Sequence, residues 1–191
     1  TWYRTLFDLL KIPFLGNHEY SVWPATDKAT TKQLLDAAGV QVPKGDLLVK
    51  GRNEVTSIKA PCVVKPCNED NSHGITFVKK DEDFQKALEY AFSFDDRVIV
   101  DEYIAGRELR VACVEEEDGS LVVLPMLEYF LEDIRTSAHK LKTSDDGKLS
   151  KNAVVEAKKD GDRKCPADVS PTLEARLSHM VKEAHRALKC R

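Results

Sequence analysis

Hydrophobic and polar residues follow two different periods along the chain, which predicts a mixture of helices and strands. Stretches with apolar residues at helical spacing predict amphipathic helices over 2–11, 27–38, 82–92 and 171–188. Short apolar runs rich in β-branched residues predict strands at 12–15, 40–42, 46–50, 62–64, 75–78, 97–104, 107–114 and 121–127. Because neighbouring strand candidates are joined by short turns, the predicted fold class is α+β.

The stretch from Cys62 to Lys80 contains two predicted strands around a polar centre. Residues 68–74 are rich in Asn, Asp, Ser and Gly, so they should connect the strands into a hairpin. Lys65 stands at the end of the first strand, where an ammonium group can lie against a phosphate while loop N–H groups contact its oxygens. A hairpin with a solvated lysine fits the same residues, so both interpretations stay open.

The ends of the predicted helices carry cap signals. Thr26 is the expected cap of the 27–38 helix, with Asp27 in its first turn, and Gly39 is the expected stop. Asp81 is the expected cap of the 82–92 helix. Residues 132–164 are highly charged and lack a period, which predicts either an active-site lid or a surface insertion.

Charge and composition narrow the function classes. The 191 residues carry a net charge of −3, with 42% hydrophobic and 32% charged residues. No basic field favours nucleic acid, and no apolar run has the length of a membrane span, so neither partner is expected. The first residues do not resemble a secretory leader, and no methionine begins the sequence, so we expect a piece of a longer chain.

The cysteines and histidines carry no recognisable metal motif. Five cysteines are odd in number and lack paired metal-ligand spacing, and the five histidines are scattered. The sequence therefore predicts no metal site in this chain. Reduced thiols are typical of a cytoplasmic protein, which is the predicted localisation.

Six segments together resemble the D-alanine–D-alanine ligase family of ATP-grasp enzymes. Their order and separations are more specific for the family than for its substrate. The segments are LLKIPFLGN at 9–17, TDKATTKQLLDAAGVQVP at 26–43, VVKPCNEDNSHGITFVKK at 63–80, VIVDEYIAGRELRVACV at 98–114, LPMLE at 124–128 and CPADVSP at 165–171.

The resemblance implies a truncated ATP-grasp fold, in which two α+β subdomains with antiparallel sheets close on ATP. It implies the end of an N-terminal domain at 1–25, a central subdomain at 26–105 and an incomplete C-terminal subdomain at 106–191, with a lid at 132–164. It also implies ligation of a carboxylate to an amine: ATP phosphorylates one small amino acid, and the second displaces phosphate from the acyl phosphate. ATP and Mg²⁺ are the implied cofactors.

The resemblance also assigns roles to individual residues. Lys28 and Lys65 would contact the phosphates, and Lys140 in the lid would reach the terminal phosphate. Asn71 and Ser72 belong to the loop that would cover them. The implied catalytic residues are Lys65, Ser72 and Lys140.

The other implied nucleotide contacts follow the 97–104 strand. Asp101 would accept from the adenine amino group, the backbone of Glu102 and Ile104 would bond the adenine edge, and Glu108 would hold the ribose hydroxyls. Apolar walls for the base are expected from Val64, Val100 and Tyr103.

The chain departs from the family pattern in two loops. Where the family has Glu-Gly-Ser-Ser, this chain has Glu69, Asp70, Asn71 and Ser72, and Leu141 stands about where the lid tyrosine is expected. An aspartate facing phosphate would cost about 1–4 kcal/mol at about 4 Å, so we expect Asp70 to point away, to lie near a cation or lysine, or to mark weaker nucleotide binding. The substitution at position 71 leaves specificity for D-alanine open.

The family's magnesium ligands follow a helix like 171–188, and no such segment lies before Arg191. We therefore expect an incomplete ligase that is inactive alone. Two alternatives stay open: a nucleotide-binding or scaffold relative without catalysis, and a purely structural α+β module. Apolar faces of the 2–11 and 171–188 helices that would pack on absent strands predict a homodimer.

Overall fold

The computed structural model describes residues 2–130 and 162–190. The chain divides into two compact units: one comprises 1–42, 109–128 and 164–191, and the other comprises 43–108 and 129–163. We call these unit 1 and unit 2 and describe each by itself. The division predicted from the sequence, 1–25, 26–105 and 106–191, stays a prediction.

Unit 2 contains a four-stranded antiparallel sheet with the strand order β1-β4-β2-β3. The predicted hairpin is confirmed: β2 and β3 pair antiparallel, with Cys62 opposite Val78 and Val64 opposite Thr76. Long-range pairing between β2 and β4 joins this hairpin to the rest of the sheet. The strands are β1 (Gly45–Val49), β2 (Cys62–Pro66), β3 (Thr76–Val78) and β4 (Arg97–Glu102).

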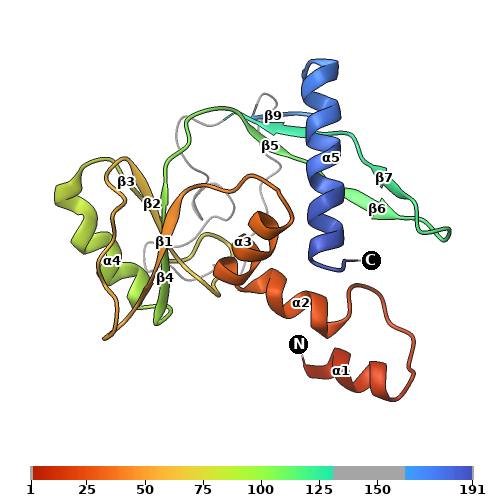
Figure 1. Ribbon diagram of the computed structural model, residues 1–191, viewed down its shortest axis with the longest axis horizontal. Coiled ribbons are helices and arrows are strands. Elements are labelled where there is room, and N and C mark those ends of the chain that lie inside the picture. Colours follow the sequence, from red (N-terminus) through yellow and green to blue (C-terminus); the bar gives the residue numbers. More distant parts are fainter. Residues whose placement is uncertain (1, 131–161, 191) are drawn as a thin grey trace, which may run out of the picture. The chain divides into compact units, whose positions relative to one another are not determined.

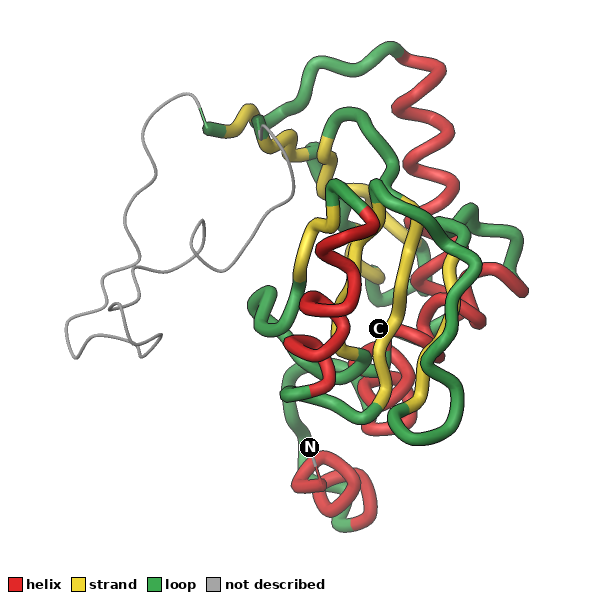
Figure 2. The backbone as a smooth tube through the Cα atoms, turned by 90° about the vertical axis from the view of Figure 1, so that its left-hand side faces the viewer, coloured by secondary structure: helices red, strands yellow, loops and turns green. Residues whose placement is uncertain are grey.

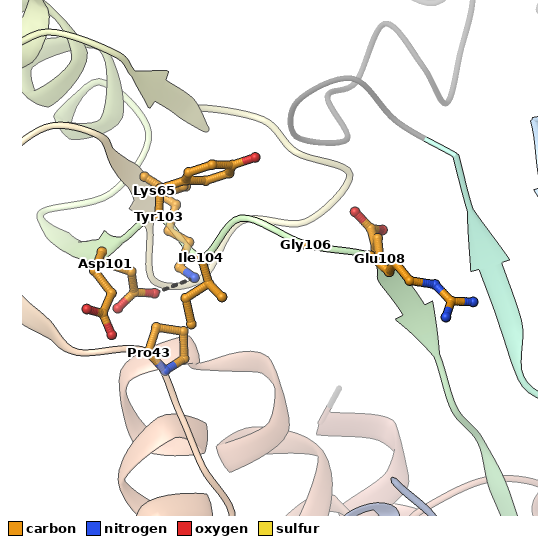
Figure 3. A pocket seen from close by; sticks show the side chains of 10 residues that line it. Pro43, Lys65, Asp101, Tyr103, Ile104, Gly106 and Glu108 are labelled. Carbon is orange, nitrogen blue, oxygen red and sulfur yellow. Dashed lines mark ion pairs between the residues drawn. The ribbon is translucent and has the colours of Figure 1, made fainter. Parts of the chain in front are cut away.

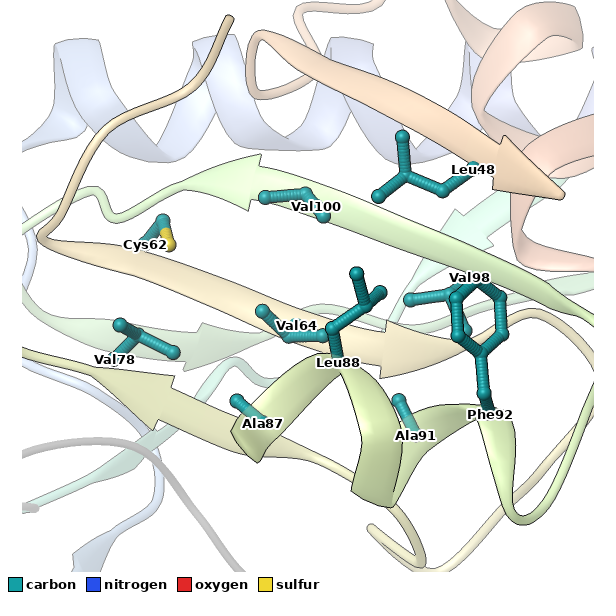
Figure 4. Close-up of a cluster of buried hydrophobic side chains, with 10 residues drawn as sticks. All are labelled: Leu48, Cys62, Val64, Val78, Ala87, Leu88, Ala91, Phe92, Val98 and Val100. Atoms are coloured by element: carbon teal, nitrogen blue, oxygen red, sulfur yellow. The ribbon is translucent and has the colours of Figure 1, made fainter. Parts of the chain in front are cut away.

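Helix α4 (Phe84–Phe92) covers one face of this sheet (Figures 1 and 2). In β2, residues 62, 64 and 66 are buried and residues 63 and 65 are partly exposed, as the period of two in a strand requires. Buried side chains from the helix and from all four strands form one cluster (Figure 4). Its members are Leu48, Cys62, Val64, Val78, Ala87, Leu88, Ala91, Phe92, Val98 and Val100.

The expected start of this helix needs a correction. A short 3₁₀ helix, η1 (Asp81–Asp83), precedes α4, and Asp81 makes no cap hydrogen bond to either element. Its Oδ1 instead accepts a hydrogen bond from the Ala60 N–H at 2.9 Å. Asp81 therefore joins the start of the helical segment to the chain just before β2.

Unit 1 is built mainly from helices. The expected amphipathic helices at both ends of the chain are confirmed, as is the hairpin β6 (Cys113–Glu115) and β7 (Leu121–Val123). The helices are α1 (Trp2–Leu9), α2 (Glu19–Thr26), α3 (Lys28–Ala37) and α5 (Pro171–Ala187).

The strand predicted over 107–114 is interrupted. Its residues form β5 (Glu108–Arg110) and β6, with residues 111 and 112 outside both strands. β5 belongs to a separate three-stranded sheet with the order β5-β8-β9, whose other members are β8 (Leu127–Tyr129) and β9 (Arg163–Lys164). The alternating pattern correctly predicted extended backbone on both sides of residues 111 and 112. It did not predict that the chain leaves the sheet of β5 there and enters the separate β6–β7 hairpin.

Two strand predictions near the beginning of the chain are wrong. Residues 12–15 are irregular, and Leu15 is 97% exposed. Pro13 cannot donate a ladder hydrogen bond, and no described strand pairs with this segment. Residues 40–42 are also irregular, although Val40 is buried and its N–H bonds to the Leu35 carbonyl at 2.9 Å.

Helix α2 was not predicted, because its sequence shows no apolar stripe and Pro24 lies inside it. Since α2 ends at Thr26, this residue is not the cap of the next helix. Asp27 takes that position, and its Oδ1 accepts from the Thr30 N–H at 2.7 Å. Ser170 caps α5 through a hydrogen bond that its hydroxyl accepts from the Leu173 N–H.

Gly74 lies at the end of the hairpin loop, and among the described glycines with a positive φ it is the one at which a Cβ would meet other atoms closer than 3.0 Å. Its φ is +71°, and a Cβ there would lie 2.5 Å from Pro66 Cγ and 2.9 Å from Phe94 Cδ2. The Pro66 ring is fully buried and is closed onto the backbone of β2, so it cannot move aside without shifting that strand.

We expect Gly74→Ala to lower the free energy of unfolding more than Gly51→Ala does. Gly51 has a φ of +72° and nothing within 4 Å of a Cβ, so it reports the backbone cost alone, about 1–2 kcal/mol. The contacts at Gly74 should add about 1–3 kcal/mol. Urea denaturation measures both, and equal losses would contradict the close packing described here.

Candidate functional site

The second face of the unit 2 sheet carries an ion pair. Val63 lies opposite Asp101 in the β2–β4 register, and Lys65 lies opposite Ile99. Lys65 Nζ is 2.7 Å from Asp101 Oδ2, with the two side chains 25% and 4% exposed (Figure 3). An almost fully buried carboxylate thus meets a lysine whose side chain is partly exposed.

This ion pair lies in a cavity of about 280 Å³. The cavity brings together five of the residues that the sequence analysis proposed for a nucleotide: Lys65, Asp101, Glu102, Ile104 and Glu108. Figure 3 shows Glu108 beyond Gly106, away from the ion pair. The other lining residues are Pro43, Val63, Tyr103, Gly106 and Arg107.

Two of the three residues that were predicted to form apolar walls of the cavity do not line it. Val64 and Val100 are fully buried in the cluster beneath α4, on the opposite face of the sheet. Val63 lines the cavity in their place, and Tyr103 lines it as expected. The alternation of β2 would have identified Val63, because residues 63 and 65 of a strand share a face.

The segment after β4 is held in an extended path. The Glu102 N–H donates to the Lys44 carbonyl at 2.9 Å, and the Tyr103 N–H donates to the Pro61 carbonyl at 3.1 Å. The Tyr103 ring also packs on Phe77, with ring centroids 4.3 Å apart. Among the described residues, the Ile104 N–H has no hydrogen-bond acceptor.

The hairpin loop between β2 and β3 is held by a contact with Asp95, which follows α4, and by a contact within the loop. Asp95 Oδ2 accepts from both the N–H and the side-chain amide of Asn68, at 2.9 and 2.8 Å. Asn71 and Ser72 have positive φ values of 48° and 64°, and neither lines the cavity. Asp70 Oδ1 accepts from the Asn71 side-chain amide at 3.0 Å, so these two unusual residues bond to each other.

The roles predicted for Lys28 and Lys140 stay predictions. Lys28 is the first residue of α3 in unit 1, so its relation to Lys65 stays a prediction. Lys140, Leu141 and most of the proposed lid lie outside the described residues. Within the described ranges, no group of three or more His, Cys, Asp or Glu side chains could hold a metal ion. No described helix is long and apolar enough to span a membrane.

Comparison with known proteins tests the resemblance. The family model described as the D-ala D-ala ligase C-terminus matches residues 46–191. The chain belongs to this family. A D-alanine–D-alanine ligase of Geobacter sulfurreducens is 26% identical over 97% of the chain, and ligase A of Mesorhizobium japonicum is 31% identical over 87% of it.

Solved structures of the family share the fold. The D-Ala:D-Ser ligase VanG of Enterococcus faecalis matches 98% of the chain with a TM-score of 0.74 and 25% sequence identity. The predicted α+β class and the ATP-grasp fold are therefore confirmed. The chain covers 54% of the Geobacter ligase, 45% of the Mesorhizobium ligase and 52% of the VanG structure, about half the length of these family members.

We expect Lys65→Met to lower the free energy of unfolding by about 1–3 kcal/mol, because it leaves the Asp101 carboxylate without its lysine partner. Lys86→Met, at an exposed position of α4, is the matched control and should change stability by less than about 0.5 kcal/mol. Urea denaturation measures both variants.

Adding Asp101→Asn to the Lys65→Met variant should restore part of the lost stability, because a neutral amide needs no countercharge. This recovery separates the ion pair from the packing of the lysine stem. Strictly additive losses would show that the two side chains do not act as a pair.

Proposed function

We propose that this chain is the nucleotide-binding part of an ATP-dependent carboxylate–amine ligase of the D-alanine–D-alanine ligase type. Such a ligase joins two small amino acids through an acyl phosphate. The observation that carries the proposal is the cavity beside β4, because five residues selected from the sequence alone line it.

The residues present at the cavity fit an adenine base. The buried Asp101 carboxylate is an acceptor for the exocyclic amino group, and the Ile104 N–H is a donor for a ring nitrogen. Val63, Tyr103 and Pro43 supply apolar surface for the planar ring. Glu108 supplies a carboxylate for the ribose hydroxyls.

Lysines hold the phosphates in this proposal. Lys65 carries a partly exposed ammonium group at the cavity, and Lys28 and Lys140 contribute further positive charges from their own segments. Asn71 and Ser72 belong to the loop beside Lys65 and contact the phosphates from it, with Ser72 assisting the substrate. ATP supplies the phosphoryl group that activates the carboxylate, and the chain's own residues bind and orient it.

Magnesium is the second proposed cofactor. The described residues contain no group of three or more His, Cys, Asp or Glu side chains that could hold a metal ion. Peptidoglycan precursors are the proposed destination of the dipeptide, and the cytoplasm is the proposed compartment. Neither nucleic acid nor a membrane is a proposed partner.

A homodimer is part of the same proposal. Helix α1 and the residues that follow it expose apolar side chains, including Leu9, which is 75% exposed, with Leu6 and Leu10 beside it in sequence. A second copy would cover them. Light scattering of the native chain should report a dimer, and of Leu9→Glu a monomer.

Nucleotide binding is tested by calorimetry with ATP and GTP. ATP should bind at least about tenfold more tightly, because the keto oxygen of guanine opposes Asp101 and its ring N–H opposes the Ile104 donor. Lys65→Ala and Glu108→Gln should weaken ATP binding, and Lys86→Ala should not. Equal affinity for both nucleotides, with both site variants unaffected, would contradict the proposed site.

Ligation is tested by phosphate release from the full natural protein across pairs of D- and L-amino acids. Release that depends on two amino acids supports a ligase. ATP binding without release for any pair would instead support a nucleotide-binding relative without catalysis. The bond between Asp70 and Asn71, in place of the family's Gly-Ser, is the observation that favours this alternative.

A further inference from the structure

Unit 1 contains a group of chemically reactive side chains that the proposed ligase site does not use. Cys113 and Glu115 are two residues apart on β6, so their side chains leave the strand on the same face. Helix α5 contacts this strand and contributes His185, which is buried. His185 Nδ1 is 3.7 Å from Cys113 Sγ, and its Nε2 is 3.3 Å from Glu115 Oε2.

These contacts connect a thiol, an imidazole and a carboxylate in series. One imidazole tautomer satisfies both: Nε2–H donates to the Glu115 carboxylate, and Nδ1 accepts from the Cys113 S–H. A base that contacts a nucleophile and is oriented by a third group is the arrangement that activates thiols. His185 is therefore oriented to receive the Cys113 proton.

A second thiol lies at the end of the same helix. The chain turns back after α5, with Lys189 at a φ of 52°, and the Cys190 N–H donates to the His185 carbonyl at 3.0 Å. The buried Ser21 hydroxyl donates to the Lys189 carbonyl and holds this turn. Both cysteines therefore contact His185. The Cys190 N–H bonds to the His185 carbonyl, and the Cys113 thiol contacts the His185 imidazole.

The electrostatics explain why these thiols need a base. Burial raises the pKa of the Cys113 thiol, and the charges of Lys182 and Arg186 partly offset this rise. Burial also raises the pKa of Cys190, and repulsion from a Cys113 thiolate raises it further. Because both pKa values are raised, both thiols are protonated at neutral pH, and Cys113 lies close enough to Cys190 to disfavour its ionisation.

We propose that Cys113 is a peroxide-reactive thiol, with His185 as its base, Glu115 as a positioning residue and Cys190 as the resolving thiol. Cys113 sulfur attacks hydrogen peroxide, the O–O bond breaks, and the thiol proton passes through His185 to the leaving hydroxide, giving a sulfenic acid and water. Cys190 sulfur then displaces the hydroxyl group as a second water and forms a disulfide. Two thiols are oxidised and one peroxide is reduced.

The test treats the folded chain with hydrogen peroxide, blocks the remaining thiols with iodoacetamide and maps the peptides by mass spectrometry. We expect a Cys113–Cys190 disulfide, while the fully buried Cys62 and Cys67 stay reduced. In Cys190→Ser, dimedone should trap a sulfenic acid at Cys113. The exposed Cys165 is the internal control and should react more slowly.

The roles of His185 and Glu115 are tested by the pH profile of oxidation. The native rate should rise with pH above neutrality as the Cys113 thiol, whose pKa is raised by burial, loses its proton. His185→Gln and Glu115→Gln should slow it about tenfold or more near neutral pH, with recovery at high pH. Thermal melting confirms that each variant is folded, and Glu115 is exposed enough to tolerate the change.

Two results would overturn the proposal. One is oxidation of Cys113 and Cys165 at the same rate in the folded native chain. The other is a sulfenic acid at Cys113 that persists in the native chain, because Cys190 would then not be its partner. An unchanged pH profile in folded Glu115→Gln would remove the positioning role.

Discussion

The antiparallel pairing of β2 with β4 is the interaction on which the rest of unit 2 depends. It places Val64 opposite Val100 and Val63 opposite Asp101. Because successive residues of a strand face opposite sides, the first pair enters the core beneath α4 and the second faces the cavity. A register shift of one residue would exchange these faces, moving Lys65 into the core and opening the cavity floor. The register of β2 against β4 therefore determines both the packing of the core and the position of the Lys65–Asp101 ion pair.

Local patterns allowed much of this fold to be predicted. The β2–β3 hairpin and helices α4 and α5 were recognised because their periods and turn residues agree with their packing. Helix α2 was not recognised, since it has no apolar stripe and contains Pro24. The strand predicted at 12–15 failed because apolar composition alone does not provide a pairing partner. Asp27 replaced Thr26 as a cap because α2 continues through Thr26.

The candidate site was predictable only in part. Family motifs selected Lys65, Asp101 and Glu108, and all three line the same cavity. The sequence did not reveal that Lys65 pairs directly with Asp101, because they lie on strands far apart in the chain. Val64 was expected to face the cavity, but residues 62, 64 and 66 of β2 face the core and residues 63 and 65 face the other side. Contacts of this kind depend on long-range register, which a local pattern does not encode.

The ion pair also affects how a nucleotide would bind. In the described structure Lys65 is paired with Asp101. A nucleotide that bonds its base to Asp101 and its phosphates to Lys65 would therefore compete with this ion pair. The loop beside it is held by Asn68 and Asp95, away from the lining of the cavity. In the proposed nucleotide complex, recognition of the base would depend on the end of β4, while contact with the phosphates would depend on the loop.

The most direct measurement of this account is photolabelling with an azido-adenine nucleotide, followed by peptide mapping. The account predicts labelling within residues 101–108, the segment that contributes most of the cavity lining. ATP should compete with this labelling, and Glu108→Gln should reduce it. Labelling confined to another part of the chain, with competition by ATP, would contradict the assignment of this cavity to the nucleotide.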